Sequence, residues 1–409
     1  MASQEKPGDK YAQALKSLGE LASPPEARGL GELLEHYREK SRLKSSAFFY
    51  EVLAGGIHDS RKRVGYFCNL VPDELIIACG ALPVRLCSHD PCWAKCGEAL
   101  LSPDLCPALK STAGEFAGKA VGDLDLLIVP AACDGKAKLA ELLSPFVEIC
   151  FLDIPRDSDY LASAGHWEER YRALFGFLRK RYQVKAGRKD LLRACDAVNK
   201  RTSVFRKIYR LRASQAGAVS TFDYFIMAQA SFHVDPLLWS EKAGALLEEA
   251  LGAGREEEKG KRIVLAGSPV LFPSFKVLEV LEEARCHVAA DTICSTYGRL
   301  YDPVQVDEET ELGILRSLAL KHIAASMCPC LIGVSKLLDR IIDLTGEYRL
   351  DGVVYHSLHL CQVFEMQSSL VRQVLKERAM PFLSLQADFA PGDKEQLRTR
   401  VEAFMEMIP

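Results

Sequence analysis

The sequence has no long hydrophobic run and no concentration of basic residues. No apolar stretch in its 409 residues approaches the roughly 18 residues that a membrane helix needs. The first residues, MASQEKPGDKYAQ, lack the apolar core of a secretory signal peptide. The formal net charge is −3, and acids and bases are mixed along the chain. These absences predict a cytoplasmic protein that binds neither membranes nor nucleic acid.

Several motifs of common enzyme classes are also missing. There is no G-x-x-x-x-G-K-[ST] loop and no strand-linked G-x-G-x-x-G, so the chain is not expected to bind a nucleotide. The G-x-S-x-G elbow of serine hydrolases is absent. C-x-x-C pairs, which are usual in zinc sites, are absent too. If ATP drives the reaction of this protein, another polypeptide must bind it.

Cysteine, in contrast, is abundant, with 14 residues in the chain. Disulfides are disfavoured in the cytosol, so metal binding or redox chemistry is the expected use of so many thiols. Cysteine is also a common core residue, and position separates the two uses. Four cysteines lie within helix or strand patterns and are interpreted as core residues: Cys79, Cys150, Cys195 and Cys286.

Eight short apolar runs predict β-strands, and helix-like segments separate them. The predicted strands are Val64–Cys68, Leu82–Cys87, Asp123–Pro130, Phe146–Asp153, Arg262–Gly267, Cys286–Asp291, Asp351–Tyr355 and Met380–Leu385. Strands that alternate with helices form parallel sheets. The predicted fold class is therefore α/β, with two parallel-sheet domains of flavodoxin or Rossmann type.

The pattern divides the chain into four segments. They are a helical leader or cap at 1–60, a first α/β domain at 61–160, a helical insertion or linker at 161–259 and a second α/β domain at 260–409. The middle segment is long, charged and helix-periodic. In the last segment, Leu271–Glu283 predicts a helix with Pro273 near its start. The two sheet domains resemble repeats of one plan, because DLDLLIVPAAC echoes DGVVYHSLHLC.

Each half carries three cysteines at comparable places. Four of these six follow predicted strands directly, and ligands of open parallel sheets bind outside the carboxyl ends of the strands. The other two lie in loops ahead of helix-like runs. Soft thiolates select iron–sulfur clusters, zinc or copper(I), and the wide spacing favours iron–sulfur. The candidate metal ligands, which can hold two 4Fe-type units at three ligands each, are Cys68, Cys106, Cys133, Cys294, Cys328 and Cys361.

The sequence leaves other residues open. Cys330 lies beside Cys328 and is either a ligand or a structural residue. A loop with Cys-x4-Cys-x3-Cys spacing before Cys106 is either an independent cluster loop or structural. Two histidines flank the Cys361 loop and are interpreted as supporting or packing residues rather than proton donors. His89 and the catalytic residues are left unassigned. The loop cysteines are Cys87, Cys92 and Cys96, and the two histidines are His356 and His359.

Two segments carry a resemblance to a known family. YFCNLVPDELIIACGALPVRLC, followed by LSPDLCPALKS, resembles the N-terminal signature of the 2-hydroxyacyl-CoA dehydratase and benzoyl-CoA reductase superfamily. DGVVYHSLHLCQ resembles its C-terminal cluster-ligand segment. PAACDGK, DTICSTYGRLYDPV and Cys328-Pro329-Cys330 resemble the additional ligand segments of the double-cubane cluster proteins of that superfamily. The resemblance runs from about residue 60 to the C-terminus.

The resemblance implies an 8Fe-9S centre, in effect two cubanes joined by a sulfide, with the six cysteines as ligands and their division left open. It implies a homodimer that reduces small molecules at very low potential. The electrons would come from a partner reductase that hydrolyses ATP and has its own 4Fe-4S cluster. Two alternatives stay open. One is a single 4Fe-4S subunit of an acyl-CoA dehydratase or reductase, and the other is a non-enzymatic electron carrier or structural metal protein.

Overall fold

The computed structural model describes residues 30–157, 159–253 and 260–408. The first part of the predicted leader, 1–29, therefore lies outside the described residues. Within the described ranges, no helix combines the length and the apolar character needed to cross a membrane.

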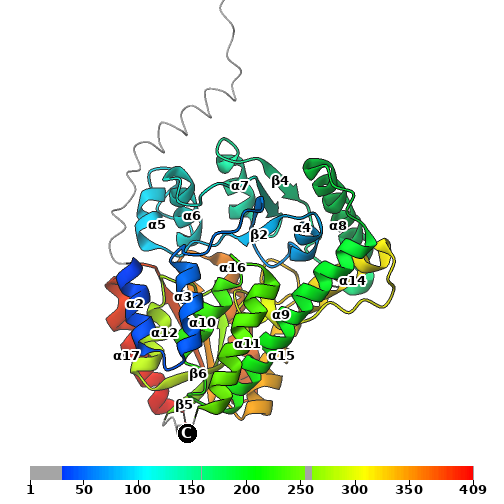
Figure 1. The fold of residues 1–409 in the computed structure, drawn as a ribbon. Helices are drawn as coiled ribbons and strands as arrows, with labels where there is room; N and C mark the ends of the chain where they lie inside the picture. The colour runs from blue at the N-terminus through cyan, green and yellow to red at the C-terminus, as the bar shows by residue number, and fades with distance from the viewer. Residues whose placement is uncertain (1–29, 158, 254–259, 409) are drawn as a thin grey trace, which may run out of the picture.

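Two four-stranded sheets organise the described chain, and every strand pairing in them is parallel (Figure 1). Each predicted strand is present, the one at Cys286–Asp291 with its predicted ends and the others with at least one end shifted, so the α/β fold class is confirmed. One central strand in each sheet is buried along its whole length, as expected where helices cover both faces of a parallel sheet. The strands are β1 (Arg63–Tyr66), β2 (Leu82–Arg85), β3 (Leu126–Pro130), β4 (Ile149–Leu152), β5 (Lys261–Gly267), β6 (Cys286–Asp291), β7 (Gly352–Leu358) and β8 (Phe382–Ala387).

The two sheets have the same topology. Their strand orders are β2-β1-β3-β4 and β6-β5-β7-β8, so the third strand of each half lies beside the first. The segments DLDLLIVPAAC and DGVVYHSLHLC, which echo each other in sequence, contain β3 and β7. The predicted repeat therefore corresponds to equivalent positions in the two sheets. Because the topology is shared, residues that follow equivalent strands lie at equivalent points on the edges of the two sheets.

Helices pack on both sheets and join the two halves (Figure 1). The predicted helical character of the 161–259 segment is confirmed in its described part by α8 to α11, whereas the domain boundaries stay a prediction. The helices are α2 (Leu30–Lys40), α3 (Ala47–Leu53), α4 (Asp73–Ala78), α5 (Pro91–Gly97), α6 (Pro107–Ala117), α7 (Asp134–Leu143), α8 (Tyr160–Tyr182), α9 (Arg188–Ser214), α10 (Thr221–Ala230), α11 (Pro236–Gly252), α12 (Lys276–Glu283), α13 (Tyr297–Leu300), α14 (Glu311–Ala325), α15 (Ser335–Tyr348), α16 (Gln362–Glu377) and α17 (Lys394–Met407).

Helix α9 contributes to the cores of both halves. Near its start, Leu191 and Cys195 are buried in the core that contains β1. Farther along, Phe205 and Ile208 are buried in the core that contains β5 and β7. These apolar residues recur at helical spacing, which explains why a charged segment still buries one face. The helix therefore ties the two sheets together through apolar packing.

The helix predicted at Leu271–Glu283 is shorter than expected, because α12 begins only at Lys276. The backbone N–H of Phe272 donates to Gln229 Oε1 at 2.7 Å, and Gln229 Nε2 donates to the Phe272 carbonyl at 3.3 Å. A helix starting at Leu271 would have paired the Phe272 carbonyl internally but not its first-turn N–H, and the Gln229 amide satisfies both groups outside a helix. The prediction of a helix start near Pro273 was wrong for this reason.

Helices α5 and α6 approach each other backbone to backbone at two glycines. A methyl group added to Gly114 would lie 2.1 Å from the Trp93 carbonyl oxygen, and one added to Gly97 would lie 1.9 Å from that of Lys110. Such distances leave no room for a side chain. Because α6 begins directly after Cys106, this close packing also holds the Cys106 loop in place.

Gly114→Ala should therefore lower the free energy of unfolding by about 1–3 kcal/mol, since the two helices would have to separate. Urea unfolding of the purified protein measures the change. Gly176→Ala is the matched control, because a methyl group there, in α8, would meet nothing within 4 Å. Removing a helix-interior glycine at an open position should raise stability by about 0.5–1 kcal/mol. Equal destabilisation by both variants would contradict the role given to Gly114.

Candidate metal centre

A cavity of about 370 Å³ lies where the carboxyl ends of the two sheets face each other. Its wall includes residues that follow β1, β2 and β3 in the first half and β5, β6 and β7 in the second. Open parallel sheets bind their ligands at this edge. The fold thus places one shared cavity between the two edges that the sequence singled out.

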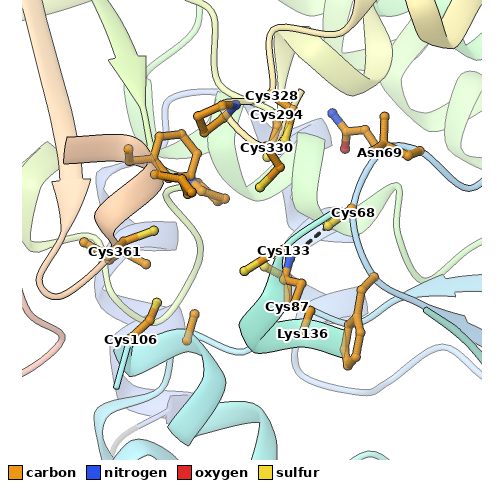
Figure 2. A pocket seen from close by; sticks show the side chains of 18 of the residues that line it. Cys68, Asn69, Cys87, Cys106, Cys133, Lys136, Cys294, Cys328, Cys330 and Cys361 are labelled. Atoms are coloured by element: carbon orange, nitrogen blue, oxygen red, sulfur yellow. Dashed lines mark hydrogen bonds between the residues drawn. The ribbon is translucent and has the colours of Figure 1, made fainter. Parts of the chain in front are cut away.

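Eight of the 14 cysteines line this cavity, all of them within the described residues (Figure 2). They include all six predicted ligands, so residues from both ends of the chain meet in one place. Two further cysteines join them. The eight are Cys68, Cys87, Cys106, Cys133, Cys294, Cys328, Cys330 and Cys361.

Of the two further cysteines, Cys87 has a position equivalent to that of a predicted ligand. Cys87 follows β2 and Cys294 follows β6, which are the equivalent second strands of the two sheets. Cys294 was selected by the strand-end rule, which states that ligands of parallel sheets bind outside the carboxyl ends of the strands. The same rule also applied to Cys87, although its Cys-x4-Cys-x3-Cys spacing had suggested a separate loop. Cys330 lies close to Cys328 and Cys133, with which its thiol forms hydrogen bonds.

The remaining cysteines lie elsewhere. Cys79 and Cys195 are buried in the core around β1, and Cys286 is buried in the core around β5. The partly buried Cys150 lies on β4 and packs against the first of these cores. These four positions agree with the interpretation as core residues. The three loop cysteines are divided, because Cys87 belongs to the cavity wall whereas Cys92 and Cys96 lie on α5.

Three of the cavity cysteines are at helix N-termini. Cys106, Cys133 and Cys361 are the residues immediately before α6, α7 and α16. Backbone N–H groups of the first helical turn donate to each of their sulfurs. Unpaired N–H groups and the helix dipole both favour an anionic sulfur at such a position. At Cys106 and Cys133 the folded chain therefore stabilises thiolate, the form of cysteine that binds metals, whereas the hydrogen bond to Cys106 raises the pKa of Cys361.

Two residues of the cavity wall have left-handed backbone conformations. Cys68 has φ 63°, and Leu360, which precedes Cys361, has φ 61°. A non-glycine residue in this region carries a conformational cost of about 1–3 kcal/mol, and such residues cluster at functional sites. Each turns the chain sharply after a strand and brings a cysteine to the cavity.

The thiols on the wall are close enough to hydrogen-bond one another. The Cys330 thiol lowers the pKa of Cys133 to about 5 and that of Cys328 to about 7. The Cys361 thiol lowers the pKa of Cys106 in the same way. Figure 2 shows Cys106 and Cys361 on one side of the cavity and the Cys328–Cys330 segment on another. The hydrogen bonds therefore favour thiolate at the accepting cysteines, whereas they raise the pKa of the donors Cys330 and Cys361.

Two cations, the half-buried Lys136 and the buried Arg85, touch the cysteines directly. Lys136 Nζ lies 3.0 Å from Cys68 Sγ (Figure 2). Arg85 donates to the Cys294 carbonyl at 2.8 Å and to Cys294 Sγ at 3.3 Å. Burial alone would lower the pKa of Lys136, but the charges of Cys68 and Cys87 raise it well above its ordinary value. Lys136 therefore stays positive beside the sulfurs.

A buried ion network supports the Cys68 loop from the second half. Asp73, at the start of α4, accepts from Arg201 at 2.9 Å and also pairs with Arg299. Arg299 further donates to the carbonyls of Asn69 at 3.3 Å and Val71 at 3.1 Å. The residues next to Cys68 are thus held by an arginine of α13, which follows β6.

The histidines do not enter the candidate ligand set. His89 lines the cavity with its Nε2 at 3.8 Å from Cys87 Sγ, and burial lowers its pKa well below the ordinary value. His356 is buried within β7, where burial lowers its pKa to about 4, and His359 is exposed. Neither His356 nor His359 belongs to the cavity wall, and the burial of His356 agrees with its interpretation as a packing residue, whereas the exposed His359 does not pack.

The donor set fits an iron–sulfur cluster. Within the described residues, no three histidine, cysteine, aspartate or glutamate side chains converge on one point to hold a single ion. The thiols instead surround a volume, and in a cluster each thiolate binds a separate iron of a multinuclear group. Soft thiolate ligands with nearby cations and backbone N–H donors are the surroundings that such clusters need.

Comparison with known proteins gives matches over most of the chain. It is 26% identical over 355 residues to the putative dehydratase subunit YjiM of Escherichia coli (strain K12), which covers 84% of this chain and 91% of that protein. It is 23% identical over 369 residues to a benzoyl-CoA reductase subunit of Thauera aromatica, covering 85% and 91%. It is 20% identical over 352 residues to the (R)-phenyllactyl-CoA dehydratase beta subunit of Clostridium sporogenes, covering 85% and 92%.

A family model identifies the family itself. The model for the family described as 2-hydroxyglutaryl-CoA dehydratase, D-component, matches residues 68–408. The match begins at Cys68, directly after β1, and includes the other seven strands and all eight cysteines of the cavity. The chain therefore belongs to the 2-hydroxyglutaryl-CoA dehydratase D-component family, within the superfamily that the resemblance predicted.

Proposed function

We propose that this protein is an iron–sulfur oxidoreductase with a double-cubane (8Fe-9S) cluster in the cavity between its two sheets. The observation that carries the proposal is the gathering of eight thiols from both sheet edges around one cavity. The proposed ligands are the six cysteines selected from the sequence. The number of thiols exceeds what a single 4Fe-4S unit needs, which supports two cubanes rather than one.

The arrangement of the thiols supports the same proposal. Cys106 and Cys361 are paired, and Cys133, Cys328 and Cys330 form a second group. Both groups combine cysteines from the first and second halves of the chain. The division of the ligands between the cubanes need not follow the two halves. When bound, such a cluster supplies electrons at very low potential.

The residues around the cysteines have separate tasks in this proposal. The N-termini of α6, α7 and α16 favour thiolate at their cysteines. Lys136 and Arg85 offset negative charge. The apolar core residues beside the wall, such as Leu109 and Leu139, limit water near the cluster.

The proposed activity is the reduction of small molecules in the cytoplasm by a homodimer. Relatives named as dehydratase and reductase subunits support a redox role. The chain has no phosphate-binding loop, so the proposed electron donor is a separate 4Fe-4S reductase that hydrolyses ATP. The small-molecule substrate is bound by this protein, and the nucleotide by its donor.

Anaerobic purification followed by iron and sulfide analysis tests the proposal. A double-cubane cluster predicts about eight irons per chain, and a single cubane predicts about four. Zinc in place of iron, or a colourless protein, would instead support a structural metal site. A redox-active cluster without any reducible substrate would support an electron carrier.

A second candidate function has support from the relatives' names. The Clostridium sporogenes and Thauera aromatica relatives are both named as subunits, and so as parts of larger enzymes. This chain would then be one 4Fe-4S subunit of an acyl-CoA dehydratase or reductase. About four irons per chain, together with copurification of a second homologous chain, would favour this candidate over a homodimeric double-cubane protein.

A further inference from the structure

Four lysine and arginine side chains that line the cavity are mostly buried, and they fall into two classes. Arg299 pairs with Asp73, and Lys321 pairs with Glu74 at 3.1 Å. Lys136 and Arg85 have no carboxylate partner among the described residues; their close contacts in the cavity are to cysteines. In this second class, no aspartate or glutamate among the described residues balances the positive charge of the side chain. The four residues on the wall are Arg85, Lys136, Arg299 and Lys321.

Lys136 is held in place by the first turns of α7. Its Nζ is 3.0 Å from Cys68 Sγ and 5.9 Å from the centre of the Phe67 ring. The helix starts immediately after Cys133, so the same turn carries a candidate ligand and the cation. Among the described residues, Cys68 is the hydrogen-bond partner of this ammonium group.

Arg85 connects the two halves of the molecule. It is the last residue of β2, and its guanidinium stacks over the Phe232 ring at 4.7 Å. From there it reaches Cys294, which follows β6 in the other sheet, through both the carbonyl and the sulfur. The side chain is 2% exposed, so these contacts replace water.

A buried cation without a nearby anion is strongly unfavourable. The two cations therefore require negative charge in the cavity, and thiolate-bound clusters carry it. A positive charge beside a cluster sulfur stabilises the reduced cluster more than the oxidised one, because the reduced cluster is more negative. Hydrogen bonds to cluster sulfurs act in the same direction.

We propose that Lys136 and Arg85 raise the reduction potential of the cluster, Lys136 through Cys68 and Arg85 through Cys294. This inference rests on the proposed function. It assigns to both side chains a role as positioning residues that act through the ligands. Because they contact one ligand from each half, they influence the cluster from two sides.

A redox titration of the purified protein, followed by absorbance or electron paramagnetic resonance, tests the inference. Lys136→Met removes the charge and keeps the approximate shape. At a fixed potential, the ratio of reduced to oxidised cluster should fall at least about tenfold, which corresponds to about 59 mV for a one-electron couple. Lys136→Arg keeps the charge and should stay close to the wild-type potential. Arg85→Gln and Arg85→Lys form a second pair with the same expectation.

The matched control is Lys138→Met, on the same helix. Lys138 is 84% exposed and pairs with Glu141, so its removal should leave the potential unchanged. Iron content is measured in every variant. Lys136→Met with full iron and the wild-type potential would overturn the inference. Iron loss in both Lys136→Met and Lys136→Arg would also overturn it, because shape rather than charge would then matter.

Two other outcomes are informative. Iron loss in Lys136→Met together with full iron in Lys136→Arg would show that the positive charge keeps the cluster bound, and the potentials of Arg85→Gln and Arg85→Lys would then decide the inference. A wild-type protein without iron would overturn the proposed function itself. That failure differs from failure of the inference alone. In the latter case the wild type has full iron, and its reduction potential is the same as that of the Lys136→Met and Arg85→Gln variants.

Discussion

Cys361→Ser should leave the anaerobically purified protein with half its iron or less, about four atoms per chain instead of about eight. The physical reason is the position of Cys361 at the N-terminus of α16, where its thiol pairs with Cys106 from the other half. Serine is a hard, weakly acidic ligand and is a poor substitute for thiolate. Cys68→Ser should have the same effect. Iron analysis and the visible absorbance of the cluster measure the loss.

The same variant should be less stable to heat. A group that binds only the folded chain adds its binding free energy to the stability, and these ligands join two sheets. Cys195→Ser is the control, because Cys195 is buried in α9 away from the cavity. It should keep its iron while losing some stability from core disruption. Equal iron loss in Cys361→Ser, Cys68→Ser and Cys195→Ser would contradict the separation of ligand cysteines from core cysteines.

Asp73→Asn should lower the free energy of unfolding by about 3–5 kcal/mol at neutral pH. The substitution leaves Arg201 and Arg299 buried without their shared carboxylate. An unpaired buried charge costs more than the original pair contributed. Because Arg299 also holds the carbonyls next to Cys68, the loop before α4 should loosen as well. Urea unfolding measures the change.

The control for this prediction is Glu141→Gln, which breaks an exposed ion pair with Lys138. Exposed pairs contribute about 0–1 kcal/mol, so the free energy of unfolding should barely change. If both variants lost a similar amount of unfolding free energy, burial of the Asp73 network would not explain its contribution to stability.

The Asp73 contribution should also depend on pH. Burial alone would raise the pKa of Asp73, but Arg299 and Arg201 together lower it from 3.8 to about 2. A carboxyl whose pKa is lower in the folded state stabilises the protein above its unfolded pKa and loses that effect as the pH falls. The stability difference between wild type and Asp73→Asn should therefore be constant above about pH 4 and shrink between pH 4 and pH 2. A difference that grows on acidification would contradict the assigned sign.

Much of the fold follows from local pattern. Each strand is a short apolar run between helix-like segments, and β3, whose sequence is almost wholly apolar, is buried throughout. The start of α12 could not be predicted, because it depends on Gln229, an amide far away in the sequence. Local propensity does not show which distant side chain will satisfy a backbone group.

The candidate site was predictable to the extent that it obeys the strand-end rule. That rule selects Cys68, Cys133, Cys294 and Cys361, and it also applied to Cys87, where loop spacing was weighted more heavily. The role of the cations Lys136 and Arg85 could not be predicted from the sequence. Nothing in the spacing of α7 distinguishes Lys136 from the exposed Lys138, because only the packing of the helix against the sheet edge decides which lysine is buried.

The wall of the cavity is completed by residues near the end of the chain, and this has a consequence for biosynthesis. On the ribosome, Cys68, Cys87, Cys106 and Cys133 emerge well before Cys361. At 5–20 residues per second, the delay between Cys133 and Cys361 is roughly 10–50 s. During that interval the nascent first half presents thiols without their partners from the second half. Metal insertion should therefore wait until Cys361 has been synthesised, and a chain terminated before Cys361 should be unable to retain iron.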